Sequence, residues 1–76
     1  WNVGNVTDMG SLFRGASAFN QNIGSWNVSK VTSMVYMFWY ATIFNQNLNS
    51  WNVSNVTDMY NMFNGSGQTP LPTWYH

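Results

Sequence analysis

Residues 26–38 read WNVSKVTSMVYMF, and close copies of this stretch begin at Trp1 and at Trp51, a spacing of 25 residues both times. The first two copies, 1–25 and 26–50, are identical at 13 of their 25 positions. A fixed period of about 20–50 residues is typical of stacked supersecondary units, none of which can bury its apolar face alone. The repeat therefore predicts the architecture, and the apolar residues that recur within it predict the core.

Three apolar columns recur at this spacing, and we expect their side chains to be buried. The β-branched residues of 3–9 favour a short strand, whereas the Met and Phe spacing over 9–16 favours one or two helical turns. Residues 19–23 then form a turn-rich return leg. Strands of neighbouring repeats are predicted to run in parallel, about 4.8 Å apart. The three apolar columns that we expect to be buried are Val6, Val31 and Val56; Met9, Met34 and Met59; and Phe13, Phe38 and Phe63.

The third repeat departs from the pattern after Phe63. It has Thr69 where the earlier copies have Phe19 and Phe44, and Pro70-Leu71-Pro72 follows. Because proline cannot donate a hydrogen bond to a neighbouring strand, it is tolerated at an edge and stops propagation. We therefore divide the chain into a first coil at 1–25, a second coil at 26–50, and a degenerate third coil at 51–76 that ends in a cap or a linker.

Charged side chains are scarce, at 5% of the 76 residues against about 25% in typical domains. Binding of nucleic acid needs clustered Lys and Arg, so the composition argues against nucleic acid as a partner. It argues equally against anionic membrane surfaces, and no apolar run approaches the ~18 residues of a membrane-spanning helix. The polar surface must come from Asn, Gln, Ser and Thr, which provide little charge repulsion between copies.

Catalytic, metal and cofactor sites are not expected. Asp8 and Asp58 occupy the same repeat position two coils apart, which is too far for paired acid–base work, and the chain contains neither Glu nor Cys. Two isolated carboxylates do not supply the oxygens of a calcium site. His76 is the single imidazole of the sequence. We predict that the protein is not an enzyme.

The pattern W-N-V-S-x-V-T-x-M-x-x-M-F-x-x-A-x-x-F-N-Q-x-I closely resembles the bacterial surface protein repeat, a unit of roughly 26 residues. That repeat occurs in BspA-like leucine-rich-repeat surface proteins of bacteria, mycoplasmas and many aquatic microbial eukaryotes, and the resemblance covers about 65 of the 76 residues. It implies a secreted or surface-anchored protein with a role in adhesion or as a stalk, and it carries over no catalytic residues. The chain departs from the family pattern at Leu12, at Ser33 and at the pair Trp39-Tyr40.

The fold class predicted from the repeat and from the resemblance is a leucine-rich-repeat-like repeat solenoid. It would contain three 25-residue coils, each with a short parallel β-strand and a short helical turn. The first residue of the chain is also the first residue of a repeat, so we expect a mature or excised piece of a longer protein.

Five Asn-x-Ser/Thr sequons are candidate N-glycosylation sites. Glycans there would account for the solubility of a chain with so few charges, and Asn27 and Asn52 are favoured because they occupy equivalent positions of neighbouring coils. The alternative is that Asn side chains hold turns or form ladders; the recurrent pairs Asn20-Gln21 and Asn45-Gln46 are expected to form such amide ladders. The sequons begin at Asn5, Asn27, Asn52, Asn55 and Asn64.

Two sets of aromatic residues have alternative roles. The column Trp1, Trp26 and Trp51 is expected in the core, and the alternative is a platform on which sugars stack. Trp39 and Tyr40 replace residues that are polar or small in the other coils, so they are candidates for an exposed contact surface. Local packing of this pair is the alternative.

These inferences predict a non-enzymatic extracellular or cell-surface module that serves in adhesion or as a filament or stalk subunit. The alternative is a carbohydrate-binding module that uses exposed aromatics such as Trp39 and Tyr40. The first coil begins abruptly at Trp1 and presents an apolar face without a cap. We therefore expect a homo-oligomer or filament formed by head-to-tail stacking, or cover from further repeats of a longer chain. Glycans are the other expected partner.

Overall fold

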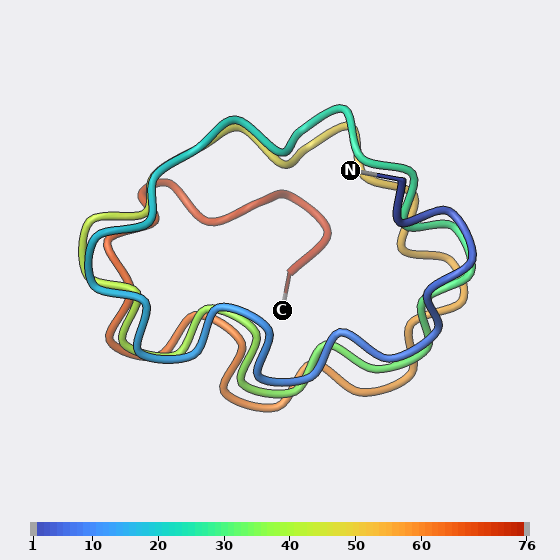
Figure 1. Ribbon diagram of the computed structural model, residues 1–76, viewed down its shortest axis with the longest axis horizontal. Coiled ribbons are helices and arrows are strands. Elements are labelled where there is room, and N and C mark those ends of the chain that lie inside the picture. The colour runs from blue at the N-terminus through green and yellow to red at the C-terminus, as the bar shows by residue number, and fades with distance from the viewer. Residues whose placement is uncertain (1, 76) are drawn as a thin grey trace.

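Each repeat makes one loop of chain, and the three loops lie over one another when the molecule is viewed down its shortest axis (Figure 1). The computed structural model describes residues 2–75. Loop one is formed by 2–25, loop two by 26–50 and loop three by 51–75. Residues 25 apart in the sequence are therefore neighbours in space, and the whole measures 26 × 23 × 20 Å.

The predicted leucine-rich-repeat-like solenoid, with a strand and a helical turn in each coil, is wrong. Residues 2–75 form a compact, turn-rich globule that contains neither a helix nor an extended strand. Their β-structure consists of isolated parallel bridges, from Asp8 to Ser33 and from Ser33 to Asp58. One residue of each repeat is thus paired in parallel with its neighbour, and the rest of each loop is built from turns.

The strand predicted over 3–9 fails because turns interrupt it. Val6 N donates to Val3 O at 3.0 Å, which closes one turn, and the Asp8 carboxylate accepts a hydrogen bond from Gly10 N at 2.8 Å, which closes another. The first of these turns recurs at the equivalent positions of loops two and three. Since a parallel ladder needs consecutive extended residues, the turns leave room for a single bridge.

The helix predicted over 9–16 is replaced by a series of turns. Alternate N–H groups donate to the carbonyl three residues back, as Leu12 N does to Met9 O at 3.2 Å. The N–H groups between them donate to the next loop, as Ser11 N does to Val35 O at 2.8 Å. In an α-helix, every successive N–H donates to the carbonyl four residues back in the same helix. Because half of the N–H groups here donate to another loop, the segment does not form an α-helix. We call residues 9–16 and their equivalents, 34–41 and 59–66, the turn ladder.

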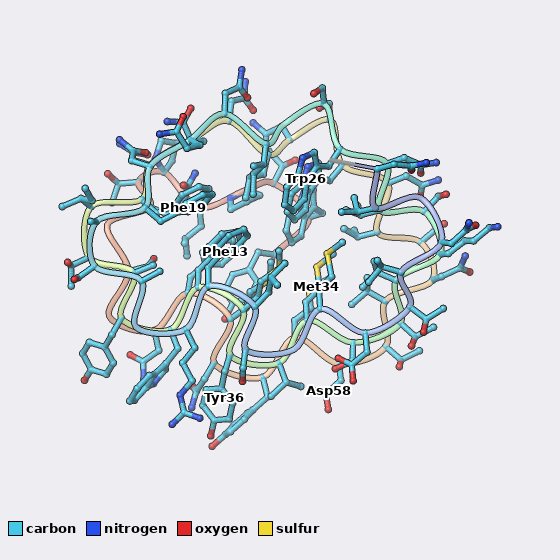
Figure 2. The ribbon with its side chains drawn as sticks, in the orientation of Figure 1. Phe13, Phe19, Trp26, Met34, Tyr36 and Asp58 are labelled. Carbon is cyan, nitrogen blue, oxygen red and sulfur yellow. The ribbon has the colours of Figure 1, made fainter. Side chains whose placement is uncertain are left out.

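The core lies inside the loops and is centred on loop two. Val31, Met34 and Phe38 are fully buried, and their counterparts in the outer loops are buried or pack partly buried against them. The three predicted apolar columns are therefore confirmed as core. Rings at the third column stack, with centroid distances of 5.6 Å from Phe13 to Phe38 and 5.4 Å from Phe38 to Phe63. Figure 2 shows Phe13 and Met34 directed inward.

Amide and hydroxyl side chains complete the hydrogen bonding that the turns leave open. Asn45 N and Gln46 Nε2 both donate to Asn20 Oδ1, at 2.9 and 2.8 Å, which confirms the predicted ladder between Asn20 and Asn45. The predicted pairing of Gln21 with Gln46 is wrong, because Gln46 bonds to Asn20 and Gln68 instead. Thr32 Oγ1 and Thr57 Oγ1 each donate to the carbonyl of the threonine one repeat earlier. No buried side-chain nitrogen or oxygen of the described residues lacks a partner. The uncharged polar surface thus contributes directly to folding.

The end of loop three turns inward and crosses the core at the C-terminal end of the stack (Figure 1). Gln68 is buried there; its Oε1 accepts from Gln46 N at 2.9 Å and its Nε2 donates to Gln46 O at 2.6 Å. Trp74 then stacks on Trp51 with a centroid distance of 6.3 Å, and Tyr75 meets Phe63 edge-on at 5.0 Å. These residues cover the core cross-section at this end.

Candidate functional site

One side of the turn ladder carries a group of outward-facing aromatic side chains. Tyr36, Trp39 and Tyr40 come from loop two, Tyr60 comes from loop three, and Arg14 of loop one lies against them. Tyr40 is 48% exposed and Tyr60 is 63% exposed. Figure 2 shows Tyr36 directed away from the core. We call these five residues the aromatic face.

The rings of the aromatic face meet edge to face. Tyr36 lies 5.7 Å from Tyr60 and 6.0 Å from Trp39, and Trp39 lies 4.3 Å from Tyr40, measured between ring centroids. Each such pair contributes about 0.5–1.5 kcal/mol beyond the burial of its surface. The mutual contacts therefore hold these rings in a fixed arrangement on the surface.

Arg14 lies over two of these rings. Its Cζ atom is 4.7 Å from the centroid of Trp39 and 5.2 Å from that of Tyr36, within the range of a cation–π contact. Within residues 2–75, the Arg14 side chain makes neither an ion pair nor a hydrogen bond. A guanidinium that contacts rings through its face keeps the N–H donors along its edge. These donors remain available to an acceptor from outside.

Two tyrosines of the aromatic face occupy left-handed backbone. The φ angles of Tyr36 and Tyr40 are 58° and 54°, in a region that costs an L-residue about 1–2 kcal/mol. At the Tyr40 position, the other repeats have Gly15 and Gly65, with φ of 66° and 76°, and glycine has no such penalty. Bulky residues in this conformation are concentrated at functional sites. Ser11 and Asn61, the counterparts of Tyr36 in the other loops, also have positive φ, of 61° and 53°. The turn ladder therefore imposes this conformation in every loop, and at residues 36 and 40 it is taken by tyrosine.

Gly65 leaves the space that the ring of Tyr40 occupies. A Cβ atom at residue 65 would lie 2.5 Å from Tyr40 Cδ1 and 2.6 Å from Cε1, which is a steric clash. At the equivalent Gly15, a Cβ atom would meet nothing within 4 Å. The position of the Tyr40 ring thus depends on the glycine of the neighbouring loop.

The sequence pointed to Trp39 and Tyr40 but missed the other members of the aromatic face. The structure brings both predicted residues to this face, with Tyr40 exposed and Trp39 partly buried. The repeat register contained the missing signal for Arg14, because Arg14 and Trp39 are equivalent positions and so lie in adjacent loops. Tyr36 and Tyr60 stand where loop one has Ser11 and Gly10, so the same comparison identifies them.

The recurrent tryptophans pack inward. Trp51 is 4% exposed, and its Nε1 donates to Ile23 O at 3.0 Å; Trp26 is partly buried against the core. The core role is confirmed for these two, whereas Trp1 lies outside the described residues. Trp74 extends the column, and the sequence analysis missed it because Trp74 follows Trp51 by 23 residues, not by the 25 of the repeat.

The favoured sequon asparagines hold turns through their oxygens. Asn27 Oδ1 accepts from Ser29 N and Asn52 Oδ1 accepts from Ser54 N, both at 3.1 Å. Both side chains are exposed. These bonds confirm the turn-holding alternative without involving Nδ2, the atom to which an N-glycan is attached. Glycosylation at these two sites is compatible with the turns and stays a prediction.

The remaining sequon asparagines are also exposed but differ in their contacts. Asn55 Nδ2 donates to Ser29 O at 2.7 Å, so the nitrogen that would carry a glycan is already bonded to the preceding loop. Asn5 Oδ1 accepts from Lys30 Nζ at 3.1 Å. Asn64 lies in the turn ladder, where its carbonyl accepts from Tyr40 N at 2.9 Å.

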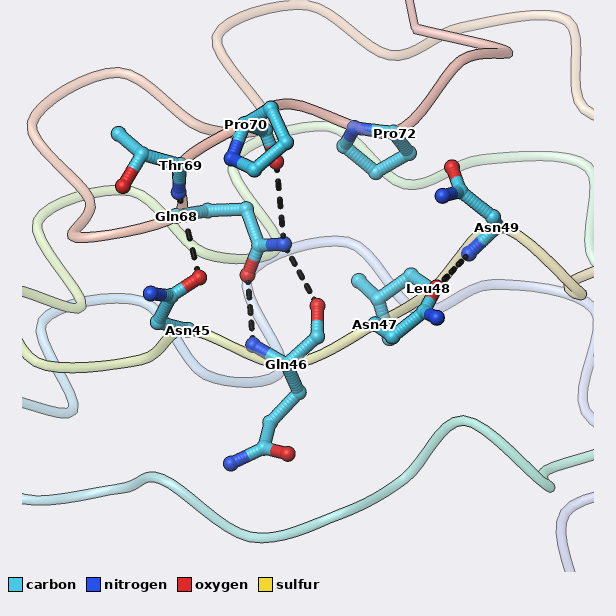
Figure 3. Close-up of a pocket in the computed structure, with 9 residues that line it drawn as sticks. All are labelled: Asn45, Gln46, Asn47, Leu48, Asn49, Gln68, Thr69, Pro70 and Pro72. Carbon is cyan, nitrogen blue, oxygen red and sulfur yellow. Dashed lines mark hydrogen bonds between the residues drawn. The ribbon is translucent and has the colours of Figure 1, made fainter.

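A polar hollow of about 260 Å³ opens beside the C-terminal segment (Figure 3). Gln68 spans it and bonds to the backbone of Gln46, and Thr69 N donates to Asn45 Oδ1 at 3.3 Å. Its lining of amides and prolines lacks a titratable side chain: Asn45, Gln46, Asn47, Leu48, Asn49, Gln68, Thr69, Pro70 and Pro72. The hydrogen bonds across the hollow assign it a structural role.

A second, apolar hollow of about 270 Å³ lies against loop one. Phe13, Phe19 and Trp26 line it and are each partly buried, together with the buried Ile23 and the exposed Gln21. Phe13 and Phe19 stack at 4.0 Å. The hollow is therefore the counterpart, on the first loop, of the surface that Trp74 and Tyr75 cover on the third.

The carboxylates lie on the surface and act in turns. Asp8 and Asp58 are exposed and accept hydrogen bonds from Gly10 N and Tyr60 N, at 2.8 and 3.1 Å. Within residues 2–75, His, Cys, Asp and Glu side chains form no group of three that would hold a metal ion. His76 lies outside the described residues. The same residues contain no helix of the length and apolarity that crossing a membrane requires.

Comparison with known proteins identifies a family. A family model described as "Mycoplasma protein of unknown function, DUF285" matches residues 1–74. No curated protein and no solved structure matches the chain.

Proposed function

We propose a function from the premise that the chain belongs to the Mycoplasma protein family DUF285. The protein is a non-enzymatic module of an extracellular or cell-surface protein. Its role is adhesion, or a place in a stalk or filament. The 25-residue motif supports counting it among the BspA-like surface proteins, whose repeat it resembles. The scarcity of charge fits a module that contacts other surfaces rather than nucleic acid.

The aromatic face is the observation that carries the proposal for adhesion. Folding alone does not require tyrosine at these positions. Serine and asparagine occupy the two positions equivalent to Tyr36, and glycine occupies both positions equivalent to Tyr40. Glycine has the lower backbone cost in the left-handed region. Exposed Tyr and Trp that other rings hold in place are typical of binding surfaces, since they offer large contact area at a low entropy cost.

Two experiments test this function. Antibodies against the folded chain are expected to label intact cells of the source organism, and external protease is expected to remove the label. Labelling that requires permeabilised cells contradicts the assignment to the surface. Beads coated with the chain are expected to adhere to cell monolayers or matrix more than beads coated with the Tyr40→Ser variant, and equal adhesion contradicts a role for the aromatic face.

We also propose that the apolar hollow on loop one is covered, either by a second copy or by further repeats. Partly exposed Phe13, Phe19 and Trp26 line it, and apolar surfaces of this kind mark association sites. Head-to-tail contacts between identical chains are heterologous, and they generate filaments when their rotation does not close. Sedimentation of the 76-residue chain over a range of concentrations is expected to show association, and a monomer at every concentration contradicts the proposal.

Carbohydrate binding is the second candidate function, and the aromatic face is the observation that favours it. The sugar platform would lie on the outer side of the turn ladder and not on the tryptophan column, because Trp26 and Trp51 pack against the core. Titration of the tryptophan fluorescence with oligosaccharides is expected to give a saturable change through Trp39, which belongs to this face. Absence of the change in the wild-type chain, or its persistence in a Trp39→Phe variant, contradicts this role.

A further inference from the structure

We propose that the aromatic face binds a sugar that carries a carboxylate, with Arg14 as the residue that binds the carboxylate group. The inference rests on the proposed adhesion function, because it names the ligand class of the same surface. It goes beyond an aromatic platform alone, since it predicts which sugars bind and which residue distinguishes them.

The first step is the availability of Arg14. Arg14 is exposed and makes no ion pair within residues 2–75. Its guanidinium contacts the faces of Trp39 and Tyr36, and its edge donors are left for an incoming group. A planar guanidinium matches the two oxygens of a carboxylate in a bidentate pair.

The second step is the local charge. Of the four charged residues in the chain, Lys30 bonds to Asn5, and both carboxylates accept hydrogen bonds from N–H groups two residues on. Among the described residues, Arg14 is the cation that contacts the rings of the aromatic face. With neighbours that are almost all uncharged, an approaching anion meets little competition for it.

The third step is the position of the rings beside the guanidinium. The C–H groups on one face of a sugar ring carry partial positive charge and pack against the negative face of an aromatic ring. Tyr40 and Tyr60 are the most exposed rings of the face, and each contacts a ring, Trp39 or Tyr36, that Arg14 also contacts. One ring therefore separates the guanidinium from each exposed tyrosine: Trp39 in the case of Tyr40, and Tyr36 in the case of Tyr60. A sugar on either tyrosine would extend its carboxylate across that ring to Arg14.

The backbone supports this arrangement. Tyr40 stands in left-handed backbone, and its ring rests on Gly65 of the next loop. Gly65 acts as a positioning residue, because any larger side chain would displace the ring. A protein surface and a neutral glycan would use the same rings without needing the unpaired Arg14, and both are tested below as rival partners.

The test uses three pairs of oligosaccharides that carry glucuronate, galacturonate or sialic acid, each compared with the same oligosaccharide after reduction of its carboxyl group. Calorimetric titration of the 76-residue chain is expected to show binding of at least one acidic member. Its neutral partner should bind about 10–100-fold more weakly, the range expected for one charge-assisted pair. Equal affinity within every pair overturns the proposal in favour of a neutral glycan. Binding of none of the six overturns it as well.

Two substitutions with the same change in charge provide the matched comparison. Arg14→Gln is expected to weaken binding of the acidic sugar about 10–100-fold, whereas Lys30→Gln, outside the aromatic face, is expected to leave it unchanged. Equal losses would indicate non-specific attraction of an anion and would overturn the assignment of Arg14. Circular dichroism of both variants confirms that they fold. If bead adhesion persists while every sugar fails to bind, the adhesion function stands and the sugar inference falls.

Discussion

Replacing Gly65 by alanine tests how the aromatic face is held, because the chain contains a matched control for it. Gly65 and Gly15 occupy equivalent positions with similar left-handed φ of 76° and 66°. A Cβ atom at residue 65 would stand 2.5 Å from the Tyr40 ring, whereas a Cβ atom at residue 15 would meet nothing within 4 Å. The two substitutions therefore share the backbone penalty and differ in the clash.

The expected magnitudes follow from this comparison. Gly15→Ala should lower the free energy of unfolding by about 1–2 kcal/mol, the cost of left-handed backbone for an L-residue. Gly65→Ala should lower it by about 1–3 kcal/mol more, because the Tyr40 ring must leave its site. The effect of glycine on the unfolded chain is the same for both and cancels. A domain of this size has a total stability of only about 4–11 kcal/mol, so the difference is readily measured.

Urea unfolding followed by tryptophan fluorescence measures both variants on one scale. Equal losses of stability would refute the reasoning, since they would show that the Tyr40 ring does not rest on Gly65. A double-mutant cycle with Tyr40→Ser gives a second check. In the Tyr40→Ser background, Gly65→Ala is expected to cost no more than Gly15→Ala does in the wild type.

Three further predictions concern the core, the C-terminal segment and the sequons. Phe38→Ala should cost about 3–5 kcal/mol in thermal or urea unfolding, because the ring is fully buried between stacked phenylalanines; a loss below about 1 kcal/mol would contradict its place in the core. Gln68→Leu should cost about 1–3 kcal/mol, because a backbone N–H and a carbonyl of loop two lose their partner; Gln21→Leu, at an exposed residue, serves as the control and should change stability by less than about 0.5 kcal/mol. In a secreted eukaryotic source, glycopeptide mass spectrometry should find glycans on Asn27 and Asn52, and two bare side chains would remove that prediction.

Register along the stack could be predicted from the sequence because it depends on repetition alone. Identical apolar residues 25 apart must face the same way if each repeat follows the same path, and Val31, Met34 and Phe38 are buried as a result. The same reasoning predicted the amide ladder of Asn20 and Asn45. These features need no knowledge of the backbone conformation within a loop, so the wrong assignment of strand and helix did not affect them.

The path within each loop was decided by hydrogen bonds between loops. Met9 and Phe13 have helical spacing, but their N–H groups donate to Ser33 O and Met37 O of loop two, and a local pattern does not reveal that competition. Left-handed residues such as Tyr36 follow from the resulting turns, in defiance of their own preference. The sequence therefore determined which residues stack, because stacking follows from repetition. The tertiary structure decided which side chains stand outside the core as an aromatic face, because the backbone of one loop takes its conformation from the loop beside it.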